Sequence, residues 1–230
     1  MRGAEMASQI KAHAAPNITA AAAVPEPHLY LVTPPLSAPA GCLPISAEAA
    51  AACGVACLFI RTAAISNAAK LEQIFQGIAV PFQERGIACL VADDSQFCLR
   101  VGADGVHLDW GGPCCEDALR ALTPNYIVGA GGLRTRHDAM IAAEAGADYV
   151  MFGEEGWPQS AIAGLVAWWA QNITVPCVGY ASGFESIRPL VGAGADFIAL
   201  GSAVFSDPRG AESALREAAA LVKPALQAGC

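Results

Sequence analysis

Three segments of the chain repeat one order of residue types: a glycine, an alanine, an aspartate and then a short apolar run. They span residues 102–108, 146–152 and 194–200, at intervals of 44 and 48 residues. The glycine suits the left-handed residue that ends a helix, and the apolar run suits a strand buried on both faces. Two further apolar runs, 126–130 and 175–180, lie between the repeats. The pattern therefore predicts five strands that alternate with helices.

The N-terminal half adds three more apolar runs, at 28–33, 56–61 and 87–92. Stretches with helical character lie between the strands and cover residues 67–85, 116–122, 135–145, 160–171, 184–191 and 209–222. Thr135 is the expected N-cap of its helix. Eight strands in alternation with helices predict a single-domain α/β fold, a closed parallel (β/α)8 TIM barrel. An open doubly wound sheet is the alternative, and the lack of a GxGxxG motif after the first strand counts against it.

The composition agrees with one such domain. The chain has 230 residues, of which 54% are hydrophobic and 15% charged, so a large core can be buried. We expect the barrel in residues 28–225, a disordered extension in 1–27 and a short tail in 226–230. The extension has no basic start followed by a long apolar segment, which argues against a signal peptide. No uninterrupted apolar run is long enough to cross a membrane, so no membrane partner is expected.

Charge and cysteine content limit the partners and the location. A net charge of −8 argues against a nucleic-acid partner, because no basic stripe is available to neutralise a phosphate backbone. The nine cysteines lack the paired spacing of a zinc site, and several lie in apolar runs. We expect reduced, structural cysteines and a cytoplasmic protein. The adjacent Trp168 and Trp169 suggest a helix face that packs on the barrel or on a second subunit of a homodimer.

In a TIM barrel the functional residues follow the C-terminal ends of the strands. Polar and glycine residues at these ends are the candidates for chemistry; they are Thr33, Arg61, Asp93, Asp94, Asp109, Gly131, Gly132, Glu154, Glu155, Ser182, Gly183, Gly201 and Ser202. Asp94 with Ser95 also suits a helix N-cap. His107 is interpreted as a histidine of the barrel interior with a satisfied hydrogen bond, and His137 as a residue of a helix surface.

At four segments the chain resembles thiamine phosphate synthase and the related TenI-type thiazole tautomerase. The matching segments are 29–33, 101–108, 143–150 and 194–205, so the resemblance covers nearly the whole predicted barrel. It implies a phosphorylated small-molecule substrate and a transferase. The synthase joins an aminopyrimidine diphosphate to a thiazole phosphate and releases pyrophosphate, with help from Mg²⁺. Such a site needs cations around the diphosphate and carboxylates around the metal.

The resemblance assigns roles to residues at the ends of the second, third and fourth strands. Arg61 matches the arginine of a Gln-x-Arg-x-Lys pattern that grips the diphosphate, whereas Phe59 and Ala63 replace its other two members. The alternative role of Arg61 is an ion pair at the barrel rim. Asp93 matches the metal-binding aspartate of an Asn-Asp-Arg motif. Gly112 stands where the family has its second metal ligand, and Asp109 is the substitute that we consider for the magnesium site.

Later loops match unevenly. Arg134 stands roughly where the family has a histidine, so it suits anion binding rather than acid–base work. Glu154 and Glu155 replace a loop rich in proline, threonine and lysine. The phosphate end agrees better, because backbone N–H groups of the last two loops bind phosphate in many TIM barrels. There the resemblance implies phosphate binding by Ser182, Gly183, Gly201 and Ser202, with a purely structural turn as the alternative.

Three functions remain open from the sequence. The first is a thiamine phosphate synthase with an altered, slower active site, in which Arg61 and Arg134 bind the diphosphate and Asp93 holds Mg²⁺. The second is a thiazole phosphate isomerase of the TenI type, with Asp109, Glu154 or Glu155 as the acid–base group. The third is a catalytically silent barrel that binds a phosphorylated ligand or a protein partner.

Overall fold

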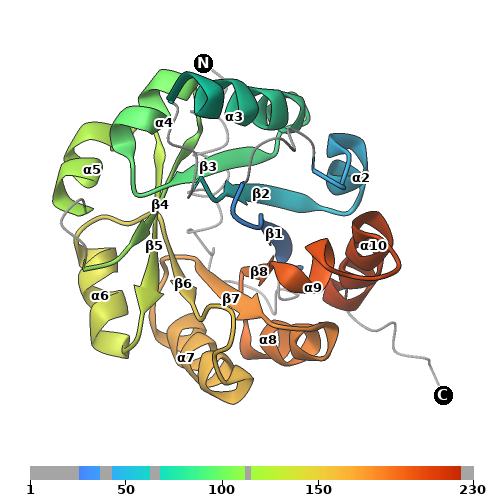
Figure 1. Cartoon of the computed structure of the whole chain (residues 1–230). Coiled ribbons are helices and arrows are strands. Elements are labelled where there is room, and N and C mark those ends of the chain that lie inside the picture. The colour runs from blue at the N-terminus through green and yellow to red at the C-terminus, as the bar shows by residue number, and fades with distance from the viewer. Residues whose placement is uncertain (1–25, 37–42, 63–67, 112–114, 224–230) are drawn as a thin grey trace, which may run out of the picture.

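Eight parallel strands close into a barrel in chain order in the computed structural model, which describes residues 26–36, 43–62, 68–111 and 115–223. Figure 1 shows the helices arranged around the outside of this barrel. The strands are β1 His28–Val32, β2 Val55–Ile60, β3 Ala88–Ala92, β4 Gly105–Asp109, β5 Ile127–Leu133, β6 Tyr149–Phe152, β7 Cys177–Ala181 and β8 Phe197–Leu200. Pairing of β1 with β8 closes the barrel, so the predicted TIM barrel is confirmed and the open sheet is excluded.

The helices follow the strands as the sequence indicates, with some differences in number and bounds. They are α2 Ala47–Ala52, α3 Ala68–Gln83, α4 Ser95–Val101, α5 Cys115–Leu122, α6 Arg136–Glu144, α7 Gln159–Asn172, η1 Phe184–Ser186, α8 Ile187–Ala193, α9 Ser202–Phe205 and α10 Ala211–Val222. The short helices α2 and α9 were not predicted, and α4 was indicated only by the expected N-cap at Asp94. The last helix begins at Ala211, two residues later than predicted, because Arg209 belongs to the preceding loop.

The repeated Gly-Ala-Asp segment closes each helix–strand connection at the N-terminal end of the barrel. Its glycines all have positive φ, at 72°, 103° and 90° for Gly102, Gly146 and Gly194. Each aspartate then bonds to the neighbouring strand through both its backbone N–H and its carboxylate. The carboxylates accept backbone N–H groups at 2.7 to 2.9 Å, in the pairs Asp104 with Cys89, Asp148 with Val128 and Asp196 with Cys177. The repeat therefore sets strand register as well as turning the chain.

The core has two layers separated by the barrel wall. The outer layer packs alternate strand residues against the helices, and it includes the fully buried Trp169. Trp169 donates from Nε1 to the carbonyl of Val175 at 2.7 Å, and Trp168 packs partly buried beside it. This confirms the first of the two interpretations of the tryptophan pair, packing on the barrel. The second layer fills the barrel interior with the opposite strand residues; its largest members are Tyr30, Tyr149, Tyr180, Phe197 and Met151.

Other predictions concern the termini, the cysteines and the membrane. Residues 1–25 and 224–230, which hold almost all of the predicted extension and tail, lie outside the described residues. Six cysteines in the described part of the chain are free thiols, and all but Cys53 are buried. Cys42, Cys114 and Cys230 lie outside it. None of the helices in the described ranges has the length and apolar character required to cross a bilayer.

Candidate active site

A cavity of about 440 Å³ opens at the C-terminal ends of the strands. Residues from all strands except β8 line it: Val32, Phe59, Arg61, Thr62, Ala92, Asp93, His107, Asp109, Gly132, Met151, Gly153, Glu154, Glu155 and Tyr180. A cavity of this size suits a small organic ligand. Arg61, Asp93 and Asp109, which the sequence places far apart, therefore meet in one cavity at the functional end of a TIM barrel.

The end of β1 holds the backbone of Arg61 in place. Thr33, which is 1% exposed, accepts the backbone N–H of Arg61 on Oγ1 at 3.0 Å. The Arg61 carbonyl accepts the N–H of Leu36 at 2.9 Å. The Arg61 side chain remains exposed at the cavity. Burial raises the pKa of Tyr180 there, the charge of Glu155 raises it further, and the charge of Arg61 lowers it by less. Arg61 is the only cation among the described residues that line the cavity.

Asp93 joins the ends of β3 and β4. Its backbone has φ 48°, a left-handed conformation that aspartate tolerates better than most residues. Its Oδ1 accepts the backbone N–H of Asp109 at 2.7 Å. Desolvation raises the pKa of Asp93, the hydrogen bond from Asp109 lowers it, and the Asp109 charge raises it. The next residue, Asp94, accepts the N–H of Phe97 at 2.7 Å and caps α4, which confirms its predicted role.

Asp109 brings a second carboxylate to the same part of the cavity. One of its oxygens lies against the α-carbon of Gly132, and a β-carbon at that position would come within 2.0 Å of Asp109 Oδ1. Gly132 also has φ 66°, so glycine is required there on both counts. Carboxylate oxygens are the ligands that Mg²⁺ prefers, and this ion retains several water or phosphate ligands. Asp93 and Asp109 are thus donors of the type that Mg²⁺ takes, although the described ranges hold no group of three or more His, Cys, Asp or Glu side chains that could bind a metal. Gly112 lies outside the described residues.

His107 forms part of the cavity floor, on the strand that ends in Asp109. Its Nδ1 lies 2.7 Å from the hydroxyl of Tyr149, which confirms the predicted satisfied hydrogen bond. Burial lowers the pKa of His107 to about 4, so the imidazole is neutral at neutral pH. The sequence interpretation missed that His107 also lines the cavity, and it did not select Tyr149 or Tyr180. The signal for His107 and Tyr149 is their position in the repeated segments, whereas Tyr180 lies in the apolar run 175–180 between two repeats.

Arg134 lies at the rim, beside the cavity rather than in its lining. Its guanidinium is 71% exposed, pairs with Glu154 at 3.8 Å and sits over the ring of Trp157, 5.6 Å from the centroid. Glu154 also accepts the indole N–H of Trp157 at 3.1 Å. Arg134 and Arg61 are therefore not brought together in one lining, and Arg134 is engaged in a cluster on the β5 and β6 loops.

The predicted phosphate-binding residues lie at the ends of β7 and β8. Gly201 lies next to the cavity, because a β-carbon on it would come within 2.6 Å of the Tyr180 hydroxyl. Ser202 begins the four-residue helix α9. At the β7 end, the Ser182 hydroxyl accepts a bond from Gln159 Nε2 at 2.6 Å. The Glu185 carboxylate lies over Gly183, 2.5 Å from where a β-carbon would stand. An acidic side chain thus borders this end of the site.

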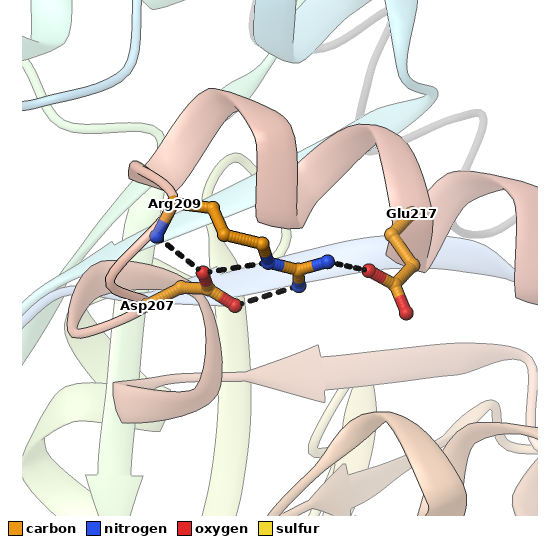
Figure 2. A network of polar contacts seen from close by, with 3 residues as sticks. All are labelled: Asp207, Arg209 and Glu217. Carbon is orange, nitrogen blue, oxygen red and sulfur yellow. Dashed lines mark hydrogen bonds and ion pairs between the residues drawn. The ribbon is translucent and has the colours of Figure 1, made fainter.

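Asp207, Arg209 and Glu217 form a cluster of ion pairs between the loop after α9 and helix α10; we call it the Arg209 cluster. Figure 2 shows the Arg209 guanidinium between the two carboxylates, 2.8 and 3.0 Å from Asp207 and 2.6 Å from Glu217. The same guanidinium lies over the ring of Phe184, the residue that follows Gly183, at 5.7 Å from the centroid. It therefore links the loop between α9 and α10 to the segment that follows β7.

Known proteins resemble this chain in sequence and in fold. Residues 29–204 match the family described as thiamine monophosphate synthase. The thiamine-phosphate synthase of Hyphomonas neptunium is 34% identical over 204 residues, 84% of this chain and 92% of that protein. The thiamine-phosphate synthase of Rhodospirillum centenum is 34% identical over 196 residues, 82% of this chain and 94% of that protein.

Among solved structures, the thiamine phosphate pyrophosphorylase from Pyrococcus furiosus has the same fold. It superposes with a TM-score of 0.72 at 24% identity and covers 86% of this chain and 96% of its own. The (S)-3-O-geranylgeranylglyceryl phosphate synthase from Thermoplasma acidophilum follows with a TM-score of 0.64 at 15% identity, which again reflects the barrel fold. On the family match and the two bacterial relatives, this chain belongs to the thiamine monophosphate synthase family.

Proposed function

We propose that the protein joins an aminopyrimidine diphosphate to a thiazole phosphate and releases pyrophosphate, at a rate below that of its relatives. The observation that carries the proposal is the shared cavity of Arg61 and Asp93. These are the residues that match the diphosphate-binding and metal-binding motifs of the family. Their convergence supports a transferase rather than a silent barrel, because both groups act on the same leaving diphosphate.

In this reaction the bond between the pyrimidine methylene and the diphosphate oxygen breaks, and negative charge grows on the leaving group. Arg61 donates hydrogen bonds to that charge from the cavity wall, and its backbone is held by Thr33 and Leu36. A fixed cation that stabilises charge in the transition state is among the larger contributions to catalysis. Arg61 is therefore the residue that we expect to contribute most to diphosphate departure.

Asp93 and Asp109 would hold Mg²⁺ at the ends of β3 and β4. The desolvated Asp93 and the nearby charge of Asp109 both disfavour two bare carboxylates, and a divalent cation between them relieves that repulsion. When bound, the ion neutralises part of the diphosphate charge. The residues of the chain orient the substrate around it.

The charge of the cavity supports a slow enzyme. Four carboxylates line it, from Asp93, Asp109, Glu154 and Glu155, against the single guanidinium of Arg61. A diphosphate brings further negative charge into this lining, and like charges in a partly desolvated site repel one another. Divalent cations must therefore compensate more charge than in a site with additional lysines or arginines. We expect weak substrate binding and a steep dependence of the rate on Mg²⁺.

The thiazole phosphate is proposed to bind at the ends of β7 and β8, through Ser182, Gly183, Gly201 and Ser202. Barrels bind phosphate with backbone N–H groups of these loops. The support is the position of Gly201, which lies against the Tyr180 hydroxyl at the cavity wall. A phosphate at this end leaves the thiazole ring directed toward the cavity. The cysteines within the described ranges, which form no disulfide, support a reducing, cytoplasmic setting for this reaction.

The test is formation of thiamine phosphate and pyrophosphate from the two substrates with Mg²⁺. We expect slow turnover that Arg61→Gln lowers by at least about tenfold, on the order of 1.5–3 kcal/mol for a charge-assisted contact. Arg120→Gln, at an exposed arginine of α5, is the matched control and leaves the rate unchanged. No product at high enzyme concentration would refute the proposal. Calorimetry then separates the alternatives: thiazole phosphate binding alone favours an isomerase, and no binding favours an interaction protein.

A further inference from the structure

A chain of buried hydrogen bonds runs from the barrel interior to the cavity floor. The hydroxyls of Tyr30 and Tyr149 lie 2.9 Å apart, and the Tyr149 hydroxyl lies 2.7 Å from Nδ1 of His107. At its inner end, Tyr30 shares a small interior cavity with the buried Cys57. All four residues are at most 8% exposed, so water does not compete for these bonds. This series of hydrogen bonds ends at the ring of His107, which lines the cavity and is the part that a ligand can reach.

The His107 ring is held in one orientation by its neighbours. Tyr149 stacks on it at 5.8 Å between centroids, and Phe59 packs at 4.7 Å. On the opposite edge from Nδ1, a β-carbon on Gly131 would come within 2.3 Å of Nε2. Rotation of the ring is therefore restricted on several sides. Within the part of the chain that the structure describes, the ring makes no hydrogen bond besides that to Tyr149. Nε2 thus has no hydrogen-bond partner among the described residues, and His107 lines the cavity.

The order of acceptor strengths along the chain selects one direction for its protons. An imidazole nitrogen is a better acceptor than a phenol oxygen, and a thiol sulfur is a weak acceptor. The Tyr149 hydroxyl therefore donates to Nδ1, and the Tyr30 hydroxyl donates to Tyr149 rather than to Cys57. A neutral ring whose Nδ1 accepts must carry its proton on Nε2. In the opposite direction, Tyr149 would donate to Tyr30, and Tyr30 would be left to donate to the Cys57 sulfur, which is a weak acceptor.

We infer that Tyr149 is a positioning residue that holds His107 in the Nε2–H tautomer, so that a neutral imidazole donates a hydrogen bond from the cavity floor to the substrate. The partner must be a hydrogen-bond acceptor, either a ring nitrogen of the aminopyrimidine or an oxygen of its diphosphate. The inference depends on the proposed function only for this choice of ligand. The tautomer is a property of the free protein and is tested without any substrate.

The first experiment is nitrogen-15 NMR of histidine-labelled protein at pH 7.5, with His107 assigned by loss of its signals in His107→Gln. We expect a protonated Nε2 and an unprotonated, hydrogen-bonded Nδ1. Tyr149→Phe shifts Nδ1 to the position of a nitrogen without a hydrogen bond. Tyr30→Phe is the matched control, because it removes an equally buried hydroxyl and leaves the Tyr149 donor in place. A protonated Nδ1 in the unmodified protein overturns the inference even where Tyr149→Phe does not fold.

The second experiment measures binding of the aminopyrimidine diphosphate and of inorganic pyrophosphate, each with Mg²⁺, by calorimetry. We expect Tyr149→Phe to raise Kd by about three- to tenfold, the range for a neutral hydrogen bond. Tyr30→Phe changes it by less than about twofold. His107→Gln, which keeps a donor near Nε2, binds more tightly than His107→Leu.

The two ligands separate the two acceptors. Weakened binding of the aminopyrimidine diphosphate alone assigns the acceptor to the ring, whereas weakened binding of both assigns it to the phosphoryl oxygens. If Tyr149→Phe binds both ligands as tightly as Tyr30→Phe does, Tyr149 has only a structural role and the inference fails. The NMR result is unaffected if the protein binds neither ligand, so failure of the proposed function is recognised separately.

Discussion

The Asp93 carboxylate accepts the backbone N–H of Asp109 at 2.7 Å, which ties together the two loops that carry the candidate metal ligands. One carboxylate oxygen of Asp93 thus fixes the loop, and the other is free to meet a cation. A substitution can separate these two roles, because asparagine retains an oxygen that accepts the N–H and loses the charge.

Asp93→Asn therefore leaves the fold intact and weakens the response to Mg²⁺. Asparagine also tolerates the left-handed backbone at this position, where φ is 48°. We expect the Mg²⁺ concentration at half-maximal activity to rise by at least about tenfold, as for loss of a charge-assisted contact. Asp94→Asn is the control, because asparagine caps a helix as well as aspartate does. An unchanged Mg²⁺ titration in Asp93→Asn would remove Asp93 from the metal site.

The aspartates of the repeated segment are predicted to stabilise the barrel rather than to act in the reaction. Asp104 accepts the N–H of Cys89 at 2.7 Å and the amide of Gln83 at 2.9 Å, at the end of the barrel opposite the cavity. Asp104→Ala leaves a buried N–H without its partner and should cost about 1–3 kcal/mol of the free energy of unfolding. Urea denaturation measures this. The exposed Asp117→Ala on α5 should be near neutral, and equal values for the two variants would contradict the assignment.

We predict that the Arg209 cluster contributes to the free energy of unfolding in a pH-dependent way, through Asp207. Hydrogen bonds from Arg209 lower the pKa of Asp207 to about 2. A carboxyl whose pKa is depressed in the folded state stabilises above its unfolded pKa, about 4, and loses this effect as the pH falls toward 2. We therefore expect Asp207→Asn to lower the urea midpoint at pH 6, with a difference from the unmodified protein that narrows below pH 4. A difference that stays constant from pH 6 to pH 3 would argue against the ion pair.

We predict that the buried His107 lowers the free energy of unfolding at moderately low pH. Burial lowers the pKa of His107 to about 4, below the value of about 6.5 in an unfolded chain. Between these values the unfolded state binds a proton that the folded state does not, so unfolding becomes easier as the pH falls from 6.5 to 4. The loss is on the order of 3 kcal/mol. Urea midpoints of the unmodified protein should fall in this window more steeply than those of His107→Gln, and parallel profiles would contradict the neutral buried ring.

Substituting Arg209 should affect the thiazole phosphate more than the aminopyrimidine diphosphate. Its guanidinium lies over Phe184, which follows Gly183 of the proposed phosphate site, and bonds Asp207 in the loop after α9. We expect Arg209→Gln to raise KM for the thiazole phosphate and to leave KM for the diphosphate substrate within about twofold. Arg216→Gln, which removes an exposed ion pair on the neighbouring helix α10, is the control. Equal changes in both KM values would indicate a general loss of stability instead.

The positions of the strands and most helices were predictable because the local pattern was strong. Strand bounds agree within a few residues, and Thr135 caps α6 as expected, with its side chain bonded to the N–H of Asp138 at 3.1 Å. The short helices α2 and α9 were missed because six and four residues carry too few turns for a periodic signal. The loop at Arg209 was mistaken for helix because its side-chain bonds to Asp207 and Glu217 are not visible in local propensity.

The candidate site was only partly predictable. Arg61, Asp93 and Asp109 follow strand ends, so barrel topology alone brings them to one end. His107 was correctly placed in the barrel interior, but its position in the cavity lining was missed. Tyr149 and Tyr180 were not selected, because strands buried on both faces are apolar throughout and their sequence does not show which side chains point inward. Arg134 pairs with Glu154 at the rim of the cavity, a contact that the sequence did not indicate, and its role in anion binding stays a prediction.

By itself, the sequence determined the alternation of strands and helices, the closing glycines and aspartates of each unit, and the end of the barrel where chemistry occurs. These follow from local conformational preferences and from the burial of apolar runs, which act over a few residues. Only the tertiary structure decided which side chains face the cavity, that four carboxylates line it together with one arginine, and that the hydrogen bonds of two tyrosine hydroxyls end at His107. Such relationships depend on barrel closure, which brings together residues separated by more than a hundred positions, as Tyr30 and Tyr149 are.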